Sequence, residues 1–142
     1  AKAAVSAVVS HMCQEYSADA SDLRPQTEAK YGIIGLLQWT GGRKERLIAL
    51  AANRGAEWTD INVQLEFLMQ EINDGSQWKW TSYAARHYPA EYDIAIEDYK
   101  RLSDPQLAAE IFCAKFVRPN YEMADLPYRR QIAQQIFDRM TM

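Results

Sequence analysis

Apolar residues recur at helical spacing in several separate stretches of this chain, and this periodicity constrains the fold more than any other feature. Residues three and four positions apart share one face of an α-helix, so residues 2–17 are predicted to form an amphipathic helix. Its inward stripe comprises Val5, Val8, Val9, Met12 and Tyr16. We interpret this stretch as a helix of the domain rather than a secretion signal, because His11, Gln14 and Glu15 interrupt it and no small-residue cleavage site follows.

Two further helices are predicted after a central irregular stretch. The first begins at Arg43 and ends at Gly55, because glycine commonly caps helix C-termini. The second is capped by Thr59 or Asp60 and is closed by Gly75. Its apolar stripe comprises Ile61, Leu65, Leu68 and Ile72.

The C-terminal third predicts two more helices. Asp104 stands directly before Pro105, which is a favourable start for a helix, and Pro119 ends that helix. The last helix runs from about Pro127, with an inward face formed by Ile132, Ile136 and Met140.

Two stretches lack a sustained helical period. Residues 76–103 are expected to hold one or two short helices broken at Pro89, and residues 18–42 carry glycines and prolines that predict a loop with a short β-hairpin. We therefore expect a mainly α, single-domain globule over residues 1–142, with one irregular excursion between its first two helices. Irregular segments on a helical scaffold are where functional sites tend to lie.

Charge and composition exclude several classes of function. The net charge is −3, and the basic residues are scattered except near Arg43, so a nucleic-acid-binding protein is not expected. No run of about eighteen apolar residues occurs, so we expect no membrane span. The two histidines and the cysteines Cys13 and Cys113 lack metal-ligand spacing. We predict no metal and no cofactor, and interpret both cysteines as buried free thiols.

Glu15 is the first candidate for a catalytic residue. It lies at the edge of the apolar stripe, four residues after His11, near the end of the predicted first helix. Apolar surroundings and the negative end of the helix dipole both disfavour a charged carboxylate, which would raise its pKa. A carboxylic acid that stays protonated near neutral pH can act as a general acid. The alternative is a solvated surface glutamate at a helix end.

A second carboxylate is available in the irregular stretch. Glycoside hydrolysis commonly uses two carboxyl groups, one on each side of the scissile bond. Asp19, Asp22 and Glu28 are the candidates, and Glu28 follows a proline-containing loop that could fold back to face Glu15. Each of the three could instead be a surface residue or a helix cap.

The adjacent Gln38 and Trp39, with Tyr31 nearby, have side chains suited to a sugar site. Amide groups bind hydroxyl and acetamido groups, and flat aromatic rings pack on pyranose faces. Thr40 would either hold a water or cap the helix that follows. An alternative for Trp39 is a core position between the hairpin and the first helix.

The predicted first helix ends in SHMCQEYS, and a short loop leads to YGIIGLLQWTGGRKERL. Further on stand Trp58, Asp60, Gln64, Leu65, Phe67 and Leu68, followed by AAEIFCAKFVRPNYEMADLPYRRQIA. Together these segments resemble the phage tail lysozyme family, which comprises lysozyme-like, peptidoglycan-degrading domains of virion proteins. The resemblance covers most of the chain and is weakest between residues 76 and 103.

The resemblance implies roles for particular residues. The family's general acid, a glutamate followed by serine, falls on Glu15, although Tyr16 here stands before Ser17. The Gly-x-x-Gln-Trp motif at residues 35–39 is similar to a motif that lines the sugar cleft of goose-type lysozymes and lytic transglycosylases. Glu28 lies roughly where goose-type enzymes have a second acidic residue, with a different spacing.

These observations predict a muramidase that cleaves the β-1,4 bond between N-acetylmuramic acid and N-acetylglucosamine. Glu15 would protonate the glycosidic oxygen, and Glu28 would activate a water or stabilise the transition state. The expected partners are peptidoglycan glycan strands and other virion proteins. Because the chain is acidic, delivery by a phage particle is the natural way for it to reach the anionic cell wall.

Two alternatives remain open. The same fold and the same Glu15 could serve a lytic transglycosylase, in which a hydroxyl of the sugar attacks and an anhydro product forms. The domain could also be an inactive lysozyme-like module that serves as a structural or wall-binding part of a virion.

Overall fold

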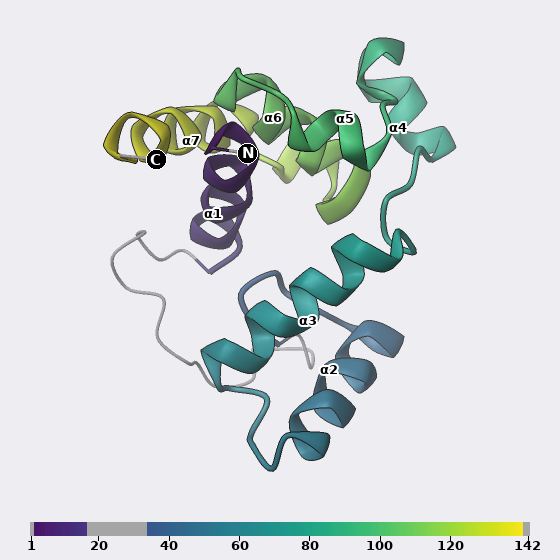
Figure 1. Ribbon diagram of the computed structural model, residues 1–142. Coiled ribbons are helices and arrows are strands. Elements are labelled where there is room, and N and C mark those ends of the chain that lie inside the picture. Colours follow the sequence, from purple (N-terminus) through teal and green to yellow (C-terminus); the bar gives the residue numbers. More distant parts are fainter. Residues whose placement is uncertain (1, 17–33, 141–142) are drawn as a thin grey trace.

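Seven α-helices follow one another along the described part of the chain in the computed structural model (Figure 1). The structure describes the backbone of residues 2–16 and 34–140, and the side chains of residues 2–12 and 34–140. The helices are α1 (Lys2–Tyr16), α2 (Gly41–Asn53), α3 (Ile61–Asp74), α4 (Ser82–His87), α5 (Ile96–Lys100), α6 (Pro105–Phe112) and α7 (Leu126–Arg139). Shorter turns are η2 (Ala90–Tyr92), the π-helical η3 (Cys113–Val117) and η4 (Tyr121–Met123).

The mainly α class predicted from the sequence is confirmed. In the described ranges, β-structure consists of one antiparallel bridge between Ile34 and Trp39. The predicted hairpin is represented there by this bridge, and the rest of the predicted excursion lies outside the described residues. None of the helices in these ranges is long and apolar enough to cross a membrane.

Helix ends lie close to where local signals predict them. Asp60 caps α3 by accepting a hydrogen bond from Asn62 N at 2.8 Å, and Asp104 caps α6 by accepting one from Gln106 N at 2.9 Å. Gly75 follows α3 in the left-handed conformation, with φ of 72°. These ends were predictable because a cap depends on residues within one turn of itself.

The inward face of α1 differs from the predicted stripe. Val5 is 44% exposed, although the stripe places it inward. The buried side chains of α1 are mostly small: Ala3, Ala4, Ser6, Ala7, Ser10, His11 and Met12. α1 packs mainly against α6 and α7, and small side chains let neighbouring helices approach closely. The prediction was therefore wrong at Val5, because close helix packing selected the small residues.

The inward face of α3 is also rotated from the prediction. Leu65 is 40% exposed, so its predicted inward position is wrong. The buried residues of α3 are Val63, Gln64, Phe67, Leu68 and Glu71. This face includes two polar side chains, and both are hydrogen-bonded.

The main core lies where α1, α6 and α7 meet. Phe112 of α6 stacks on Phe116 at 4.7 Å between ring centroids and on Tyr99 at 5.8 Å. The Tyr99 hydroxyl donates to the carbonyl of Ala4 at 3.1 Å, which ties α5 to α1. Figure 1 shows α2 and α3 as a pair on one side of this core, and α1 runs from the α6–α7 group toward that side.

Candidate active site

Glu15 lies in the last turn of α1, so its predicted position at the end of the first helix is confirmed. Its side chain is outside the described ones, as is that of Cys13. Glu28, Tyr31 and the other candidate carboxylates, Asp19 and Asp22, lie outside the described residues. The site is therefore described from the buried contacts of α1 before this helix end and from the turn at residues 34–39 with its neighbours.

One turn before Glu15, His11 is completely buried and bonded on both ring nitrogens. Its Nε2 donates to the carbonyl of Ala109 on α6 at 2.8 Å, so Nδ1 is the acceptor for Nη1 of Arg129. Arg129 is buried at the start of α7, and its Nε donates to the carbonyl of Ala124. Burial and the charge of Arg129 hold the pKa of His11 well below its ordinary value. His11 is therefore a neutral residue that joins α1, α6 and α7.

The predicted Gly-x-x-Gln-Trp motif forms a tight turn from Ile34 to Trp39. Ile34 and Trp39 exchange backbone hydrogen bonds of 3.0 and 2.7 Å, and Gln38 N donates to the carbonyl of Gly35 at 3.0 Å. Gly35 has φ of +85°, and a Cβ at this position would lie 2.5 Å from Cε3 of Trp39. Glycine is required here because it avoids both the backbone strain and the clash.

Gln64 of α3 attaches this turn to the helix. Its Oε1 accepts from Leu36 N at 2.8 Å, and its Nε2 donates to the carbonyl of Trp58 at 3.1 Å. Gln64 is buried, so each of these bonds satisfies a group that water does not reach. The turn is consequently fixed to α3 by a side chain as well as by packing.

Trp39 occupies a core position. It is 1% exposed, its ring lies edge-on to that of Phe67 at 5.4 Å, and its Nε1 donates to Oε1 of Glu71 at 2.9 Å. A buried ring cannot present its face to a sugar, so Trp39 has the core position given as the alternative. Its ring contact and hydrogen bond are made with α3, however, where that alternative expected the first helix. Its role in this structure is to anchor the turn.

Gln38 and Thr40 flank Trp39 and are more accessible. Gln38 is partly exposed in a left-handed conformation, with φ of 55°, and its Nε2 donates to the carbonyl of Gly35 at 3.0 Å. Its Oε1 has no hydrogen-bond partner in the described part of the protein. Thr40 is exposed at the N-cap of α2, but its side chain makes no capping bond, so capping by this hydroxyl is not observed.

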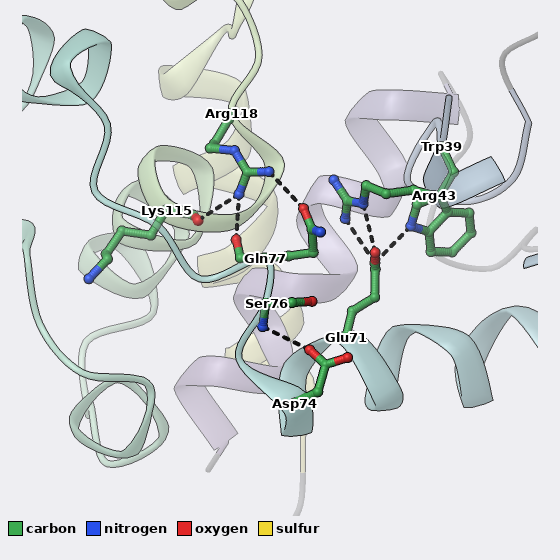
Figure 2. Close-up of polar contacts among 8 residues, drawn as sticks. All are labelled: Trp39, Arg43, Glu71, Asp74, Ser76, Gln77, Lys115 and Arg118. Carbon is green, nitrogen blue, oxygen red and sulfur yellow. Dashed lines mark hydrogen bonds and ion pairs between the residues drawn. The ribbon is translucent and has the colours of Figure 1, made fainter. Parts of the chain in front are cut away.

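Glu71 is the polar centre beneath the turn. Its carboxylate accepts from Nε of Arg43 at 2.7 Å and from Nη2 of Arg43 at 2.8 Å, in addition to the indole of Trp39 (Figure 2). The Arg43 guanidinium also lies 5.2 Å above the ring of Phe116 in η3. Because three N–H groups occupy this buried carboxylate, it is suited to positioning the turn and not to acid–base catalysis.

The chain leaves α3 through a fixed turn. After Gly75, Asp74 Oδ1 accepts from Ser76 N at 2.8 Å, and the hydrogen bonds from Ser76 lower the pKa of Asp74. Gln77 follows and is nearly buried. Figure 2 shows this turn beside the contacts of Glu71 and Arg118.

Arg118, in the left-handed conformation after η3, holds that turn. It donates to the backbone carbonyl of Gln77, to Gln77 Oε1 at 2.8 Å and to the carbonyl of Lys115 at 3.0 Å. Burial lowers the pKa of Arg118, and the positive charge of Arg43 lowers it further, whereas Glu71 opposes both effects. Two guanidinium groups and one carboxylate therefore interact where the α2–α3 pair meets η3.

Sequence reasoning missed Glu71, Arg43 and Arg118, and named Gln64 only as part of a motif. The available signal was polarity at two positions seven residues apart, Gln64 and Glu71, on the same face of α3 as Phe67. The described residues contain no group of three or more histidine, cysteine or acidic side chains that could hold a metal ion. The Cys113 side chain is buried, as predicted.

Comparison with known proteins identifies a family for this chain. The family model of phage tail lysozyme matches residues 1–140, which is nearly the whole chain and includes Glu15 and the turn at residues 34–39. No curated protein sequence matches the chain. The match agrees with the helical fold, and the chain belongs to the phage tail lysozyme family, whose members are lysozyme-like domains that degrade peptidoglycan.

Proposed function

We propose that this domain is a muramidase that hydrolyses the β-1,4 bond between N-acetylmuramic acid and N-acetylglucosamine. The observation that carries the proposal is the place of Glu15 in the last turn of α1, in a chain matched over residues 1–140 by the phage tail lysozyme family. The turn that precedes α2 adds support, because buried contacts from Gln64 and Glu71 fix its shape.

Glu15 is the proposed general acid. The unsatisfied carbonyl groups of a helix C-terminus disfavour a negative charge, so the last turn of α1 favours the protonated carboxyl. Glu15 would give its proton to the glycosidic oxygen as the bond breaks. Glu28 is the proposed second carboxylate, which would activate a water on the opposite face of the sugar or stabilise the positive charge of the transition state.

The proposed sugar contacts are polar. Gln38 Oε1, which has no partner among the described residues, can accept a hydrogen bond from a sugar hydroxyl or from an acetamido N–H. The exposed Thr40 hydroxyl can donate or accept one. Tyr31 is proposed to add an aromatic surface. Trp39 contributes indirectly, because its anchoring by Glu71 sets the position of Gln38.

We also propose that the domain acts as part of a phage particle, in its tail or as an injected protein. The family is phage-associated, and a net charge of −3 gives the chain no electrostatic attraction to an anionic wall. Attachment to a phage particle would raise the concentration of the domain at the cell wall, which electrostatic attraction does not do.

Digestion of purified peptidoglycan, followed by mass spectrometry of the released fragments, tests the reaction. The proposal predicts soluble fragments with reducing N-acetylmuramic acid ends. Fragments with 1,6-anhydro ends would contradict hydrolysis and identify a lytic transglycosylase. Binding to insoluble peptidoglycan without any release would identify a wall-binding module instead.

A further inference from the structure

The side-chain amide of Gln77 has an orientation that its neighbours determine. Arg118 Nη2 can only donate, so the Gln77 atom that it contacts at 2.8 Å must be the carbonyl oxygen. The NH₂ group consequently lies on the other side of the amide. Gln77 is 8% exposed, yet this NH₂ group has no hydrogen-bond partner in the described part of the protein. A buried donor without an acceptor is uncommon and costs stability.

Arg43 presents a second set of donors to the same place. In Figure 2 the Gln77 amide lies between the guanidinium groups of Arg118 and Arg43. Nε and Nη2 of Arg43 are occupied by Glu71, which leaves the two N–H groups of Nη1 without a protein acceptor in the described ranges. The Arg43 side chain is 20% exposed, so a ligand can reach it from solvent.

The local charge favours an anion. Arg43 and Arg118 carry two positive charges and are close enough to influence each other, whereas Glu71 supplies one negative charge. A group that binds both Arg43 Nη1 and Gln77 Nε2 must accept hydrogen bonds, and a carboxylate does so with both oxygens.

We propose that Arg43 and Gln77 form a subsite for a carboxylate of the substrate. Glu71 links this subsite to the Trp39 turn, because its carboxylate binds both Trp39 and Arg43. Muramic acid differs from glucosamine by a lactyl group that ends in a carboxyl group, and stem peptides attached there carry further carboxylates. The choice of a muramyl carboxylate rests on the function proposed above, whereas the anion site itself does not.

A binding experiment without turnover tests the subsite. The Glu15→Gln variant, labelled with ¹⁵N, is titrated with N-acetylmuramic acid and separately with N-acetylglucosamine, and the Gln77 side-chain NH₂ signals are followed by NMR. Because charge-assisted hydrogen bonds are strong, N-acetylmuramic acid is expected to bind roughly tenfold more tightly and to shift these signals. Equal affinities for these two sugars and for N-acetylmuramyl-L-alanine, or Gln77 signals that none of the three ligands shifts, would overturn the proposal.

Two further ligands distinguish the sources of the carboxylate. N-acetylmuramyl-L-alanine carries its carboxylate on the peptide, and N-acetylmuramyl-L-alaninamide carries none. Tight binding of the former and weak binding of the latter would assign the subsite to the stem peptide. Tight binding of N-acetylmuramic acid alone would assign it to the lactyl group. Tight binding of the alaninamide would contradict a carboxylate site.

Gln77→Glu is the matched variant, because it keeps an oxygen for Arg118 and replaces the NH₂ donor with a negatively charged acceptor. It is expected to abolish the preference for N-acetylmuramic acid. Gln135→Glu, the same change at an exposed position of α7, is expected to keep that preference. If Gln77→Glu keeps the preference as well, the subsite is refuted. Catalysis is measured separately on the wild type, so failure of the muramidase proposal would be recognised independently.

Discussion

At the scale of single residues, the turn before α2 depends on side chains whose roles are structural. Gly35 allows the turn to close on Trp39, Gln64 binds its backbone, and Glu71 binds the indole. These residues are buried, and the side chains of Gln64 and Glu71 are hydrogen-bonded, so the accessible Gln38 belongs to a turn that is held rigidly. A site residue held in this way loses little conformational freedom when a ligand binds.

Gly35→Ala should destabilise the fold more than Gly75→Ala does. Both glycines have positive φ, of 85° and 72°, so both substitutions carry a backbone cost of about 1–2 kcal/mol. Only at Gly35 would the new Cβ meet the Trp39 ring, whereas nothing lies within 4 Å at Gly75. Overpacking adds about 1–3 kcal/mol. Urea denaturation of both variants measures the difference, and equal losses would show that the turn tolerates a Cβ.

At the scale of elements, the sequence predicted where helices begin and end better than which faces they bury. Asp60, Gly75 and Asp104 act within one turn, so their effect can be read locally. The exposure of Val5 and Leu65 depends on the partner helix, which periodicity alone does not identify. Apolar spacing therefore placed the helices correctly while assigning these two side chains to the wrong environment.

The candidate site was predictable to a similar extent. Glu15 and the Gly-x-x-Gln-Trp turn could be located, because their signals are contiguous motifs. The buried contacts of Glu71 and Gln77 could not be predicted, since polar side chains are mostly exposed and nothing local marks these two as exceptions. Their burial results from contacts with Arg43 and Arg118, which come from distant parts of the chain.

Glu71→Gln should loosen the connection between α2, the turn and α3. The variant removes the charge that pairs with Arg43 and one of the acceptors shared with Trp39. Hydrogen bonds to charged groups contribute roughly 1.5–3 kcal/mol, so we expect a loss of free energy of unfolding in that range. Denaturant unfolding measures the loss of stability, and the near-ultraviolet circular dichroism of the tryptophans reports a change in the surroundings of Trp39.

Glu66→Gln is the matched control on the same helix, because Glu66 pairs with Arg54 at an exposed position. No measurable loss of stability is expected there, since exposed ion pairs contribute little. Equal losses in the two variants would contradict the role assigned to Glu71.

At the scale of the whole molecule, a buried polar contact joins three helices around the end of α1 that carries Glu15. His11 of α1 bonds to Ala109 of α6 and to Arg129 of α7. The position of the last turn of α1 therefore depends on the core formed with α6 and α7. A general acid must be held within hydrogen-bond reach of its target, and this core would hold the helix end that carries Glu15 in a fixed position.

The stability of the fold should fall below pH 6.5 because of His11. Its pKa is lowered in the folded protein, whereas in the unfolded chain it titrates near 6.5. As the pH falls below that value, the unfolded chain binds a proton that the folded protein does not. The free energy of unfolding should then decrease by up to about 1.4 kcal/mol per pH unit, and it should be independent of His11 above pH 7.5 or so.

Urea denaturation between pH 5.5 and 7.5 checks this dependence. His11→Gln should be less stable at pH 7.5 and should show a flatter profile than the wild type. His87→Gln, a change at the exposed histidine, should keep the wild-type slope. If the free energy of unfolding of His11→Gln depends on pH as steeply as that of the wild type, another group causes the loss of stability below pH 6.5.

The most direct test of the whole account is the rate at which Glu15→Gln releases reducing ends from peptidoglycan, compared with wild type and with Glu45→Gln. Glu45 is an exposed glutamate of α2 and provides the matched control. Removal of a general acid should lower the rate by about 10²–10⁴-fold, with the thermal unfolding midpoint almost unchanged. The control should retain the wild-type rate. Wild-type activity in folded Glu15→Gln would contradict the assignment of Glu15 as the acid.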